Sequence, residues 1–112
     1  MRPRGKRQAR QHMLHLIKRR LKGSRRKTNE YCNRALSLSD VVWQRFQVGV
    51  YQYQLKHLKW FLEEGTKYLQ PSTRYRYWLA VKVVVEKLNK EADWIPQLQG
   101  SWTNPTGNET GD

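Results

Sequence analysis

Residues 71–96 read PSTRYRYWLAVKVVVEKLNKEADWIP, and the spacing of their apolar side chains decides the fold. Pro71-Ser72-Thr73 breaks the preceding chain and caps a new helix, and Pro96 ends it. Between them, apolar residues recur at i, i+3, i+7, i+10 and i+14, the spacing of one helix face: Trp78, Val81, Val85, Leu88 and Ala92. The stretch therefore predicts an amphipathic helix.

Toward the N-terminus, the next apolar stretch predicts a second helix. We expect it to begin near Ser37-Leu38-Ser39-Asp40, because a serine caps orphan amides and an acidic residue suits the first turn. Gly65 is the expected end. The segment from Gln47 to Leu55 alternates Tyr and Gln in a way that a strand would also tolerate. The flanking helical signals favour a helix with a kink at Gly49.

A third, shorter helix is expected from Gln8 to Lys22. Leu14, Ile17 and Leu21 fall at i, i+3 and i+7, with Met13 and Leu16 beside them. An isolated helix of this length is marginal in water. We expect it to form on contact with a polyanion, or by laying its apolar stripe on the rest of the protein.

Composition divides the chain into four regions: a basic arm at 1–27, partly helical, a polar connector at 28–38, a helical body at 39–96, and a tail at 97–112. The tail is rich in Gly, Asn, Thr and Pro and is expected to be disordered. The predicted fold class is all-α, as a helical hairpin or three-helix bundle. Two helices bury too little apolar surface to offset chain entropy. A third helix or a homodimer through the helical body is therefore expected.

Charge is concentrated in the arm. The chain has 22 Lys and Arg against 9 Asp and Glu, and residues 1–27 hold 12 of the basic residues and none of the acidic ones. Such a segment favours an anionic partner, of which nucleic acid is the commonest, because each neutralised phosphate releases counterions. The arm therefore predicts nucleic-acid binding, with DNA and RNA both open. A membrane surface or an acidic protein is the competing interpretation.

The residues expected to contact nucleic acid are the arm's basic side chains and two arginines of the body: Arg2, Arg4, Lys6, Arg7, Arg10, Lys18, Arg19, Arg20, Lys22, Arg25, Arg26, Lys27, Arg74 and Arg76. Arginine and lysine bind phosphates, and Arg-rich segments often fold on binding RNA or lie along a DNA groove. No zinc finger, RNA-recognition strand pair or placeable helix-turn-helix selects bases. Binding is therefore expected to be mostly electrostatic and weakly selective.

Aromatic residues alternate with arginine at Arg74-Tyr75-Arg76-Tyr77-Trp78, where some side chains are expected to face a partner or water. Trp43 and Trp78 lie on apolar stripes and are expected to be core residues.

Two basic clusters have the spacing of a bipartite nuclear-import signal. Lys6-Arg7 precedes Lys18-Arg19-Arg20-Leu21-Lys22 by ten residues, and an import receptor would read the segment as an extended chain. In a eukaryotic or viral protein this predicts the nucleus, and otherwise the cytoplasm.

Signatures of catalysis are missing: there is no glycine-rich phosphate loop, nucleophile elbow or convincing carboxylate pair. His12 and His15 lack a third metal ligand, and Cys32 has no evident general base. We expect neither an enzyme nor a cofactor or metal site. No apolar run approaches the roughly 20 residues of a membrane span.

Three alternatives stay open beside the leading interpretation, a nuclear nucleic-acid-binding accessory or regulatory protein of viral type. The first is a protein–protein adaptor whose arm serves only import. The second is a ribosome-associated RNA-binding protein. The third is a membrane-surface helix at 8–22, held by Leu14, Ile17 and Leu21.

Overall fold

The chain folds into helices alone in the part that the computed structural model describes, residues 3–18 and 25–103. The α-helices are α1 (Lys6–Lys18), α2 (Arg25–Phe46), α3 (Leu55–Trp60), α4 (Pro71–Lys87) and α5 (Glu91–Trp94). Shorter turns are η1 (Val50–Gln52), η2 (Phe61–Gly65, a π-helix), η3 (Ile95–Leu98) and η4 (Ser101–Thr103). The predicted all-α fold class is confirmed.

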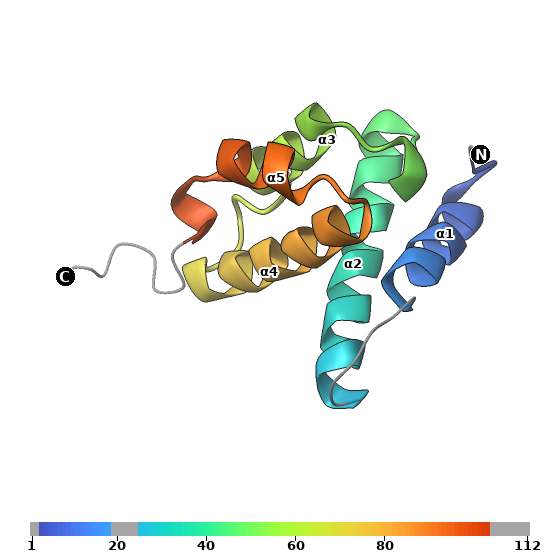
Figure 1. Ribbon diagram of the computed structural model, residues 1–112, viewed down its shortest axis with the longest axis horizontal. Coiled ribbons are helices and arrows are strands. Elements are labelled where there is room, and N and C mark those ends of the chain that lie inside the picture. Colours follow the sequence, from blue (N-terminus) through green and yellow to red (C-terminus); the bar gives the residue numbers. More distant parts are fainter. Residues whose placement is uncertain (1–2, 19–24, 104–112) are drawn as a thin grey trace.

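Three helices make the centre of the molecule. α1 runs antiparallel beside α2, and α4 crosses α2 and also contacts α1 (Figure 1). α3 and η2 lie beside α2, and the turns after α4 fold back until η4 packs on it. The predicted arm is therefore a full member of a three-helix core rather than a free extension.

One hydrophobic core joins all these elements. The largest of its fully buried side chains come from α1, α2, η1, α3, η2, α4 and the C-terminal turns: Phe61, Met13, Ile17, Leu38, Leu58, Leu62, Leu98, Val42, Val50, Val81, Val84 and Val85. Burying one such side chain contributes roughly 1.5–3 kcal/mol. The arm helix contributes two of them, Met13 and Ile17, which is the reason α1 stays on the body.

The apolar stripe predicted from residues 71–96 is buried on one continuous helix only in its N-terminal part. Trp78, Val81 and Val85 are buried, with Pro71 at the first turn of α4. The helix then ends at Lys87, and Asn89 turns the chain with φ 62°, a left-handed conformation that asparagine tolerates. Ala92 consequently falls in α5 and is exposed.

α2 begins twelve residues earlier than the capping signal at Ser37 predicts. It starts at Arg25, so the expected connector at 28–38 is part of a helix of 22 residues. The physical reason lies in its buried side chains, since Cys32, Ala35 and Leu38 recur at helical spacing and enter the core. The favourable packing overrides the local cap.

The single helix expected up to Gly65 is broken after Phe46. Gln47 has φ 57°, and the chain continues through η1, α3 and η2, which ends at Gly65. A Cβ added at Gly49 would lie 2.6 Å from the Pro3 Cγ, so the glycine lets the N-terminal residues pack directly on the backbone. The expected kink is thus a complete turn that receives the start of the chain.

The packed domain also extends further than expected at its other end. Within the predicted tail, Leu98 and Trp102 are buried in the core, and the Trp102 Nε1–H donates to the Leu98 carbonyl at 2.6 Å. Two apolar anchors suffice to fold the segment through Thr103, despite its polar composition. Residues 104–112 lie outside the described residues.

Candidate nucleic-acid interface

α1 has two faces of different character. Ala9, Met13, Leu16 and Ile17 are buried against the body, as the stripe of the arm predicts. The outer face exposes Lys6, Arg7, Gln11 and His15, and the whole helix contains no acidic residue. The packing therefore fixes the orientation of this basic face relative to the body.

The start of the chain holds three cations near one end of α1. Arg4, Lys6 and Arg7 are exposed, while Pro3 is buried on Gly49. The Arg4 backbone N–H donates to the Gln8 Oε1 at 2.7 Å, which satisfies an amide just before the helix. These cations are carried by an ordered backbone, so binding a polyanion requires little further ordering of this segment.

Arg10 differs from its neighbours because the body neutralises it. Its Nη1 lies 2.6 Å from the Asp40 Oδ2 on α2. Behind this pair, burial raises the pKa of the Tyr53 phenol, and the negative charge of Asp40 adds to the effect. The Tyr53 hydroxyl consequently stays neutral, and the predicted contact of Arg10 with nucleic acid competes with a contact inside the protein.

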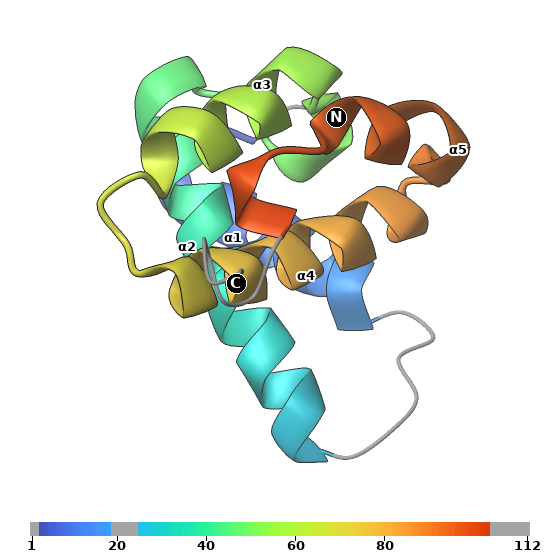
Figure 2. The ribbon, with the colours of Figure 1, turned by 90° about the vertical axis from the view of Figure 1, so that its left-hand side faces the viewer.

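The remaining arm residues cluster where α1 ends and α2 begins. Lys18 is the last residue of α1, and Arg25, Arg26 and Lys27 start α2, whose first turns project beyond the body in both views (Figures 1 and 2). The other predicted arm residues lie outside the described residues: Arg2, Arg19, Arg20 and Lys22. The helical backbone at Arg25, Arg26 and Lys27 thus lies at a protruding tip of the molecule (Figures 1 and 2).

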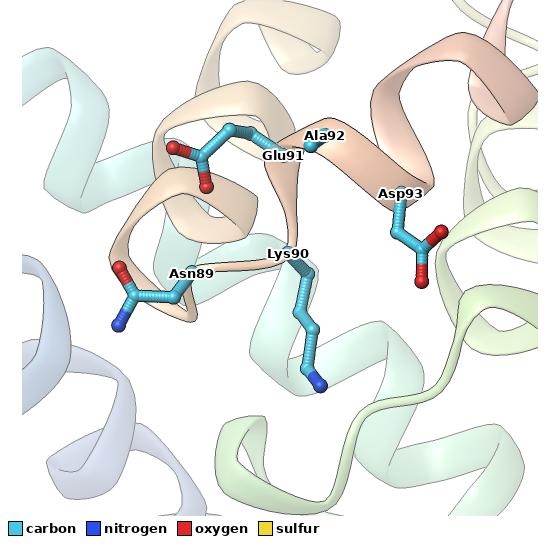
Figure 3. Close-up of a pocket in the computed structure, with 5 residues that line it drawn as sticks. All are labelled: Asn89, Lys90, Glu91, Ala92 and Asp93. Carbon is cyan, nitrogen blue, oxygen red and sulfur yellow. The ribbon is translucent and has the colours of Figure 1, made fainter.

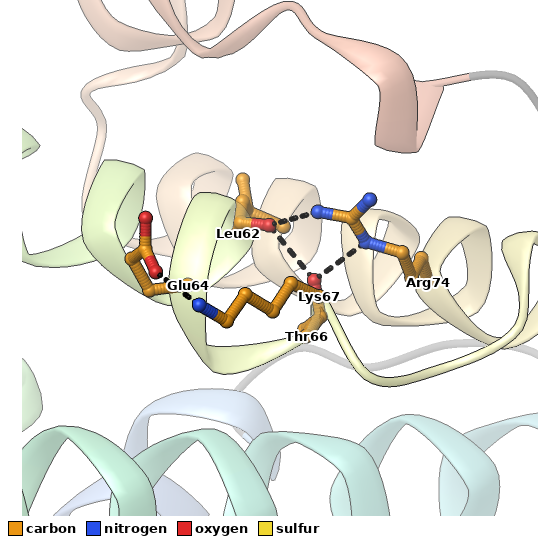
Figure 4. A network of polar contacts seen from close by, with 5 residues as sticks. All are labelled: Leu62, Glu64, Thr66, Lys67 and Arg74. Atoms are coloured by element: carbon orange, nitrogen blue, oxygen red, sulfur yellow. Dashed lines mark hydrogen bonds and ion pairs between the residues drawn. The ribbon is translucent and has the colours of Figure 1, made fainter.

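Arg74 ties three segments together. Its Nη2 donates to the Leu62 carbonyl at 2.7 Å and its Nε to the Thr66 Oγ1 at 3.0 Å, while the Thr66 hydroxyl donates to the same carbonyl at 2.8 Å (Figure 4). Its Nη1 reaches the Ser101 Oγ at 3.3 Å, and its guanidinium lies 5.7 Å from the Trp102 ring centroid. The predicted role of Arg74 at an interface therefore competes with a structural one.

The other members of the aromatic and basic group separate by burial. Trp78 is buried, as expected, and Tyr75 and Tyr77 pack partly on the core, whereas Arg76 is exposed. Trp43, also expected in the core, is only half-buried. Elsewhere, Tyr68 is exposed, with 85% of its surface accessible.

His57 holds the first turn of α3 only in its neutral form. Its Nδ1 accepts a hydrogen bond from the Gln54 backbone N–H at 3.0 Å, and its ring centroid lies 4.7 Å from that of Phe46. Burial lowers the pKa of His57 below its usual 6.5, and the charge of Lys56 lowers it further. A proton on Nδ1 would remove the acceptor.

Acidification is therefore expected to destabilise the fold through His57. Because its folded pKa is lower than its unfolded pKa, its contribution is complete above pH 6.5 and is lost as the pH falls through the folded value. The free energy of unfolding in urea should be smaller at pH 5 than at pH 7.5. His57→Gln should flatten this dependence, whereas His15→Gln, at an exposed position, should retain it. Equal pH dependence in all three proteins would contradict the assignment.

A depression on the described part of the chain has no converging groups (Figure 3). The chain turn after α4 lines an open depression with Asn89, Lys90, Glu91, Ala92 and Asp93. Their side chains point apart rather than toward one centre (Figure 3). Among the described residues, no group of three potential metal ligands lies together.

The membrane and import interpretations meet the same obstacle. Of the apolar residues proposed for a lipid surface, Ile17 is buried in the core and Leu14 packs partly on it, so both are already used inside the protein, while Leu21 lies outside the described residues. The ten-residue spacer of the import signal lies within α1, so a receptor that reads an extended chain would have to release Met13 and Ile17 from the core. Nuclear import through this signal stays a prediction. No helix in the described ranges is both long and apolar enough to cross a membrane.

Comparison with models of protein families, with curated proteins and with solved structures gives no match for this chain.

Proposed function

We propose that the chain is a small nucleic-acid-binding accessory or regulatory protein that binds mainly through phosphate contacts. The observation that carries the proposal is the excess of positive charge in residues 1–27, part of which is carried by the packed helix α1. Residues 1–27 hold 12 basic and no acidic residues, and Arg4, Lys6 and Arg7 are exposed at one end of a helix that is packed on the body. The rest of the chain has 10 basic and 9 acidic residues and cannot offset this charge.

A fixed array of cations suits a polyphosphate. Of the basic side chains on α1 that the structure describes, Arg10 is the one paired with the body. Lys6 and Arg7 are exposed, so their charges are hydrated and attract counterions. When a nucleic acid binds, its phosphates would replace these counterions, and the cations condensed on the nucleic acid would be released. Because α1 is already ordered, little conformational entropy is lost on binding.

Deleting residues 1–27 is an unsuitable test, because it removes Met13 and Ile17 from the core along with the charge. Substitution of exposed side chains separates the two effects. The test variant is Arg4→Gln/Lys6→Gln/Arg7→Gln. The matched control is Lys56→Gln/Lys59→Gln/Lys90→Gln, which removes the same charge from exposed positions outside the arm.

We expect the native chain to bind with a salt dependence equivalent to roughly five or more phosphate contacts. The arm variant should lower the slope of log K against log salt by about 2–3 and weaken binding at least about tenfold at 0.1 M salt, since each contact contributes about 0.9 to the slope. The control should change both quantities much less. Fluorescence anisotropy with duplex DNA, single-stranded DNA and structured RNA measures these effects.

Two results would count against the proposal. Equal losses in the two variants would mean that total charge, and not the arm, determines binding. If the native chain binds none of the three nucleic acids, the function is not nucleic-acid binding. The adaptor alternative would then direct attention to the exposed Tyr68 and Leu69.

A further inference from the structure

The outer face of α1 carries a row of polar side chains suited to hydrogen bonding. Arg7, Gln11 and His15 follow one another at i, i+4 and i+8, so they share one side of the helix, and all three are exposed. None of them forms a hydrogen bond or an ion pair with another part of the chain in the described ranges. Their donors and acceptors are available to a partner.

The chemistry of this row matches the edges of base pairs. An arginine can donate two hydrogen bonds to the O6 and N7 of guanine, and a glutamine can pair with the N6 and N7 of adenine. A histidine ring can donate or accept according to its tautomer. Gln11, at the centre of the row, carries no charge, so it adds nothing to the electrostatic attraction for phosphates but can pair with a base edge.

The position of α1 permits entry into a groove. The helix lies at one edge of the molecule (Figure 1), and its inner face is fixed by Met13, Ile17 and the Arg10–Asp40 ion pair. A helix is about 10–12 Å in diameter, and the major groove of B-form DNA is about 12 Å wide. Resting on the proposed function, we infer that α1 lies in the major groove of duplex DNA and reads base edges through Arg7, Gln11 and His15.

Charge along the helix is complementary to this occupant. Arg4 lies exposed before its first turn and Lys6 lies exposed within it, so that cations border the row at this end, as a phosphate strand borders a groove. The surfaces of η2 and α4 are less suited to a polyanion, because they expose acidic side chains. Glu63 and Glu64 are exposed on η2, and Glu86 is exposed on α4.

Duplex DNA is favoured over the other nucleic acids by the same face. The major groove of A-form RNA is too deep and narrow for side chains to read. Single strands are typically held by stacking on aromatic rings. α1 contains no Trp, Tyr or Phe, so it offers no such platform.

The inference is tested by separating sequence preference from charge. The full-length protein is used to select sequences from a duplex DNA library with a random central region at 0.15 M salt. Affinities are then measured for the selected duplex, a scrambled duplex, and the RNA duplex of the same sequence. The informative variant is Gln11→Ala, which removes no charge, and its matched control is Gln44→Ala, at an exposed glutamine on α2.

We expect an enriched motif, and weakening of its binding by roughly tenfold in Gln11→Ala, because one bidentate pair is worth about 5- to 150-fold in discrimination. Preference at one base position should flatten, while the salt slope and the affinity for the scrambled duplex stay unchanged. Gln44→Ala should behave as the native chain does.

Salt-dependent binding of DNA with no enriched motif would overturn the inference and leave the proposed function standing. So would a preference for the RNA duplex, or equal behaviour of Gln11→Ala and Gln44→Ala. Absence of binding to any nucleic acid would instead remove the proposed function itself.

Discussion

Replacement of both Met13 and Ile17 by alanine is expected to lower the free energy of unfolding by roughly 4–10 kcal/mol. Both side chains are fully buried where α1 meets the core. Truncating each loses its transfer free energy and leaves a cavity, at a cost of about 2–5 kcal/mol per residue. Since small domains are stable by only about 5–15 kcal/mol, much of the population should unfold. Urea denaturation followed by circular dichroism measures the change.

The matched control changes the same helix on its other side. Gln11→Ala/His15→Ala alters two exposed residues and should shift the stability by no more than about 0.5 kcal/mol per site. If the Met13 and Ile17 variant were as stable as this control, the arm would be a loosely attached segment. The scaffold argued for the basic face would then be absent.

Replacement of Arg74 by methionine is expected to cost about 2–4 kcal/mol. Methionine keeps much of the apolar stem but removes the charged donor of the hydrogen bonds to the Leu62 carbonyl and the Thr66 hydroxyl, and a hydrogen bond to a charged group contributes about 1.5–3 kcal/mol. The contact of the guanidinium with the Trp102 ring adds to the loss. Thermal and urea unfolding measure the stability, and the fluorescence emission of the tryptophans reports on the surroundings of Trp102.

Arg76→Met is the natural comparison, because Arg76 is exposed on the same helix and is expected to contribute about 0.5 kcal/mol or less to stability. The pair also tests the expected contact of both arginines with nucleic acid. If Arg74→Met weakened nucleic-acid binding while leaving the stability intact, Arg74 would belong to the interface and not to the fold.

Periodicity predicts those parts of the fold that one element determines alone. Trp78, Val81 and Val85 are buried as their spacing indicates, and so is Ile17 in the arm. In each case the apolar residues repeat every three or four positions, so a single amphipathic face accounts for the burial. The same reasoning assigned the all-α class.

Contacts between distant segments determine what the sequence alone does not predict. The serine and aspartate near residue 40 look like a helix start, yet α2 continues through them because Cys32 and Leu38 pack in the core. Trp102 lies in a segment whose composition predicts disorder, and its contacts with the core, the Leu98 carbonyl and the Arg74 guanidinium hold it in place. Capping residues and local composition do not indicate which distant residues a segment will pack against.

The sequence predicts which region of the chain holds the candidate site, but not which of its basic side chains are available to a partner. Counting charges locates the arm, but Arg10 is paired with Asp40 across 30 positions of sequence, and Arg74 with segments on either side of it. Gln11, which carries no charge, drew no attention in the sequence. Its exposure follows from helical spacing once the buried side of α1 is known.

Because α1 has a packed side and a free side, selection for folding and selection for binding act on different residues of the same helix. Substitutions on the packed side change whether the chain folds, so they are constrained by all of its neighbours at once. Substitutions at Gln11 or His15 meet almost no neighbours and leave the fold nearly untouched. Mutation can therefore explore new contacts along the free side of this helix without first acquiring compensating changes in the core.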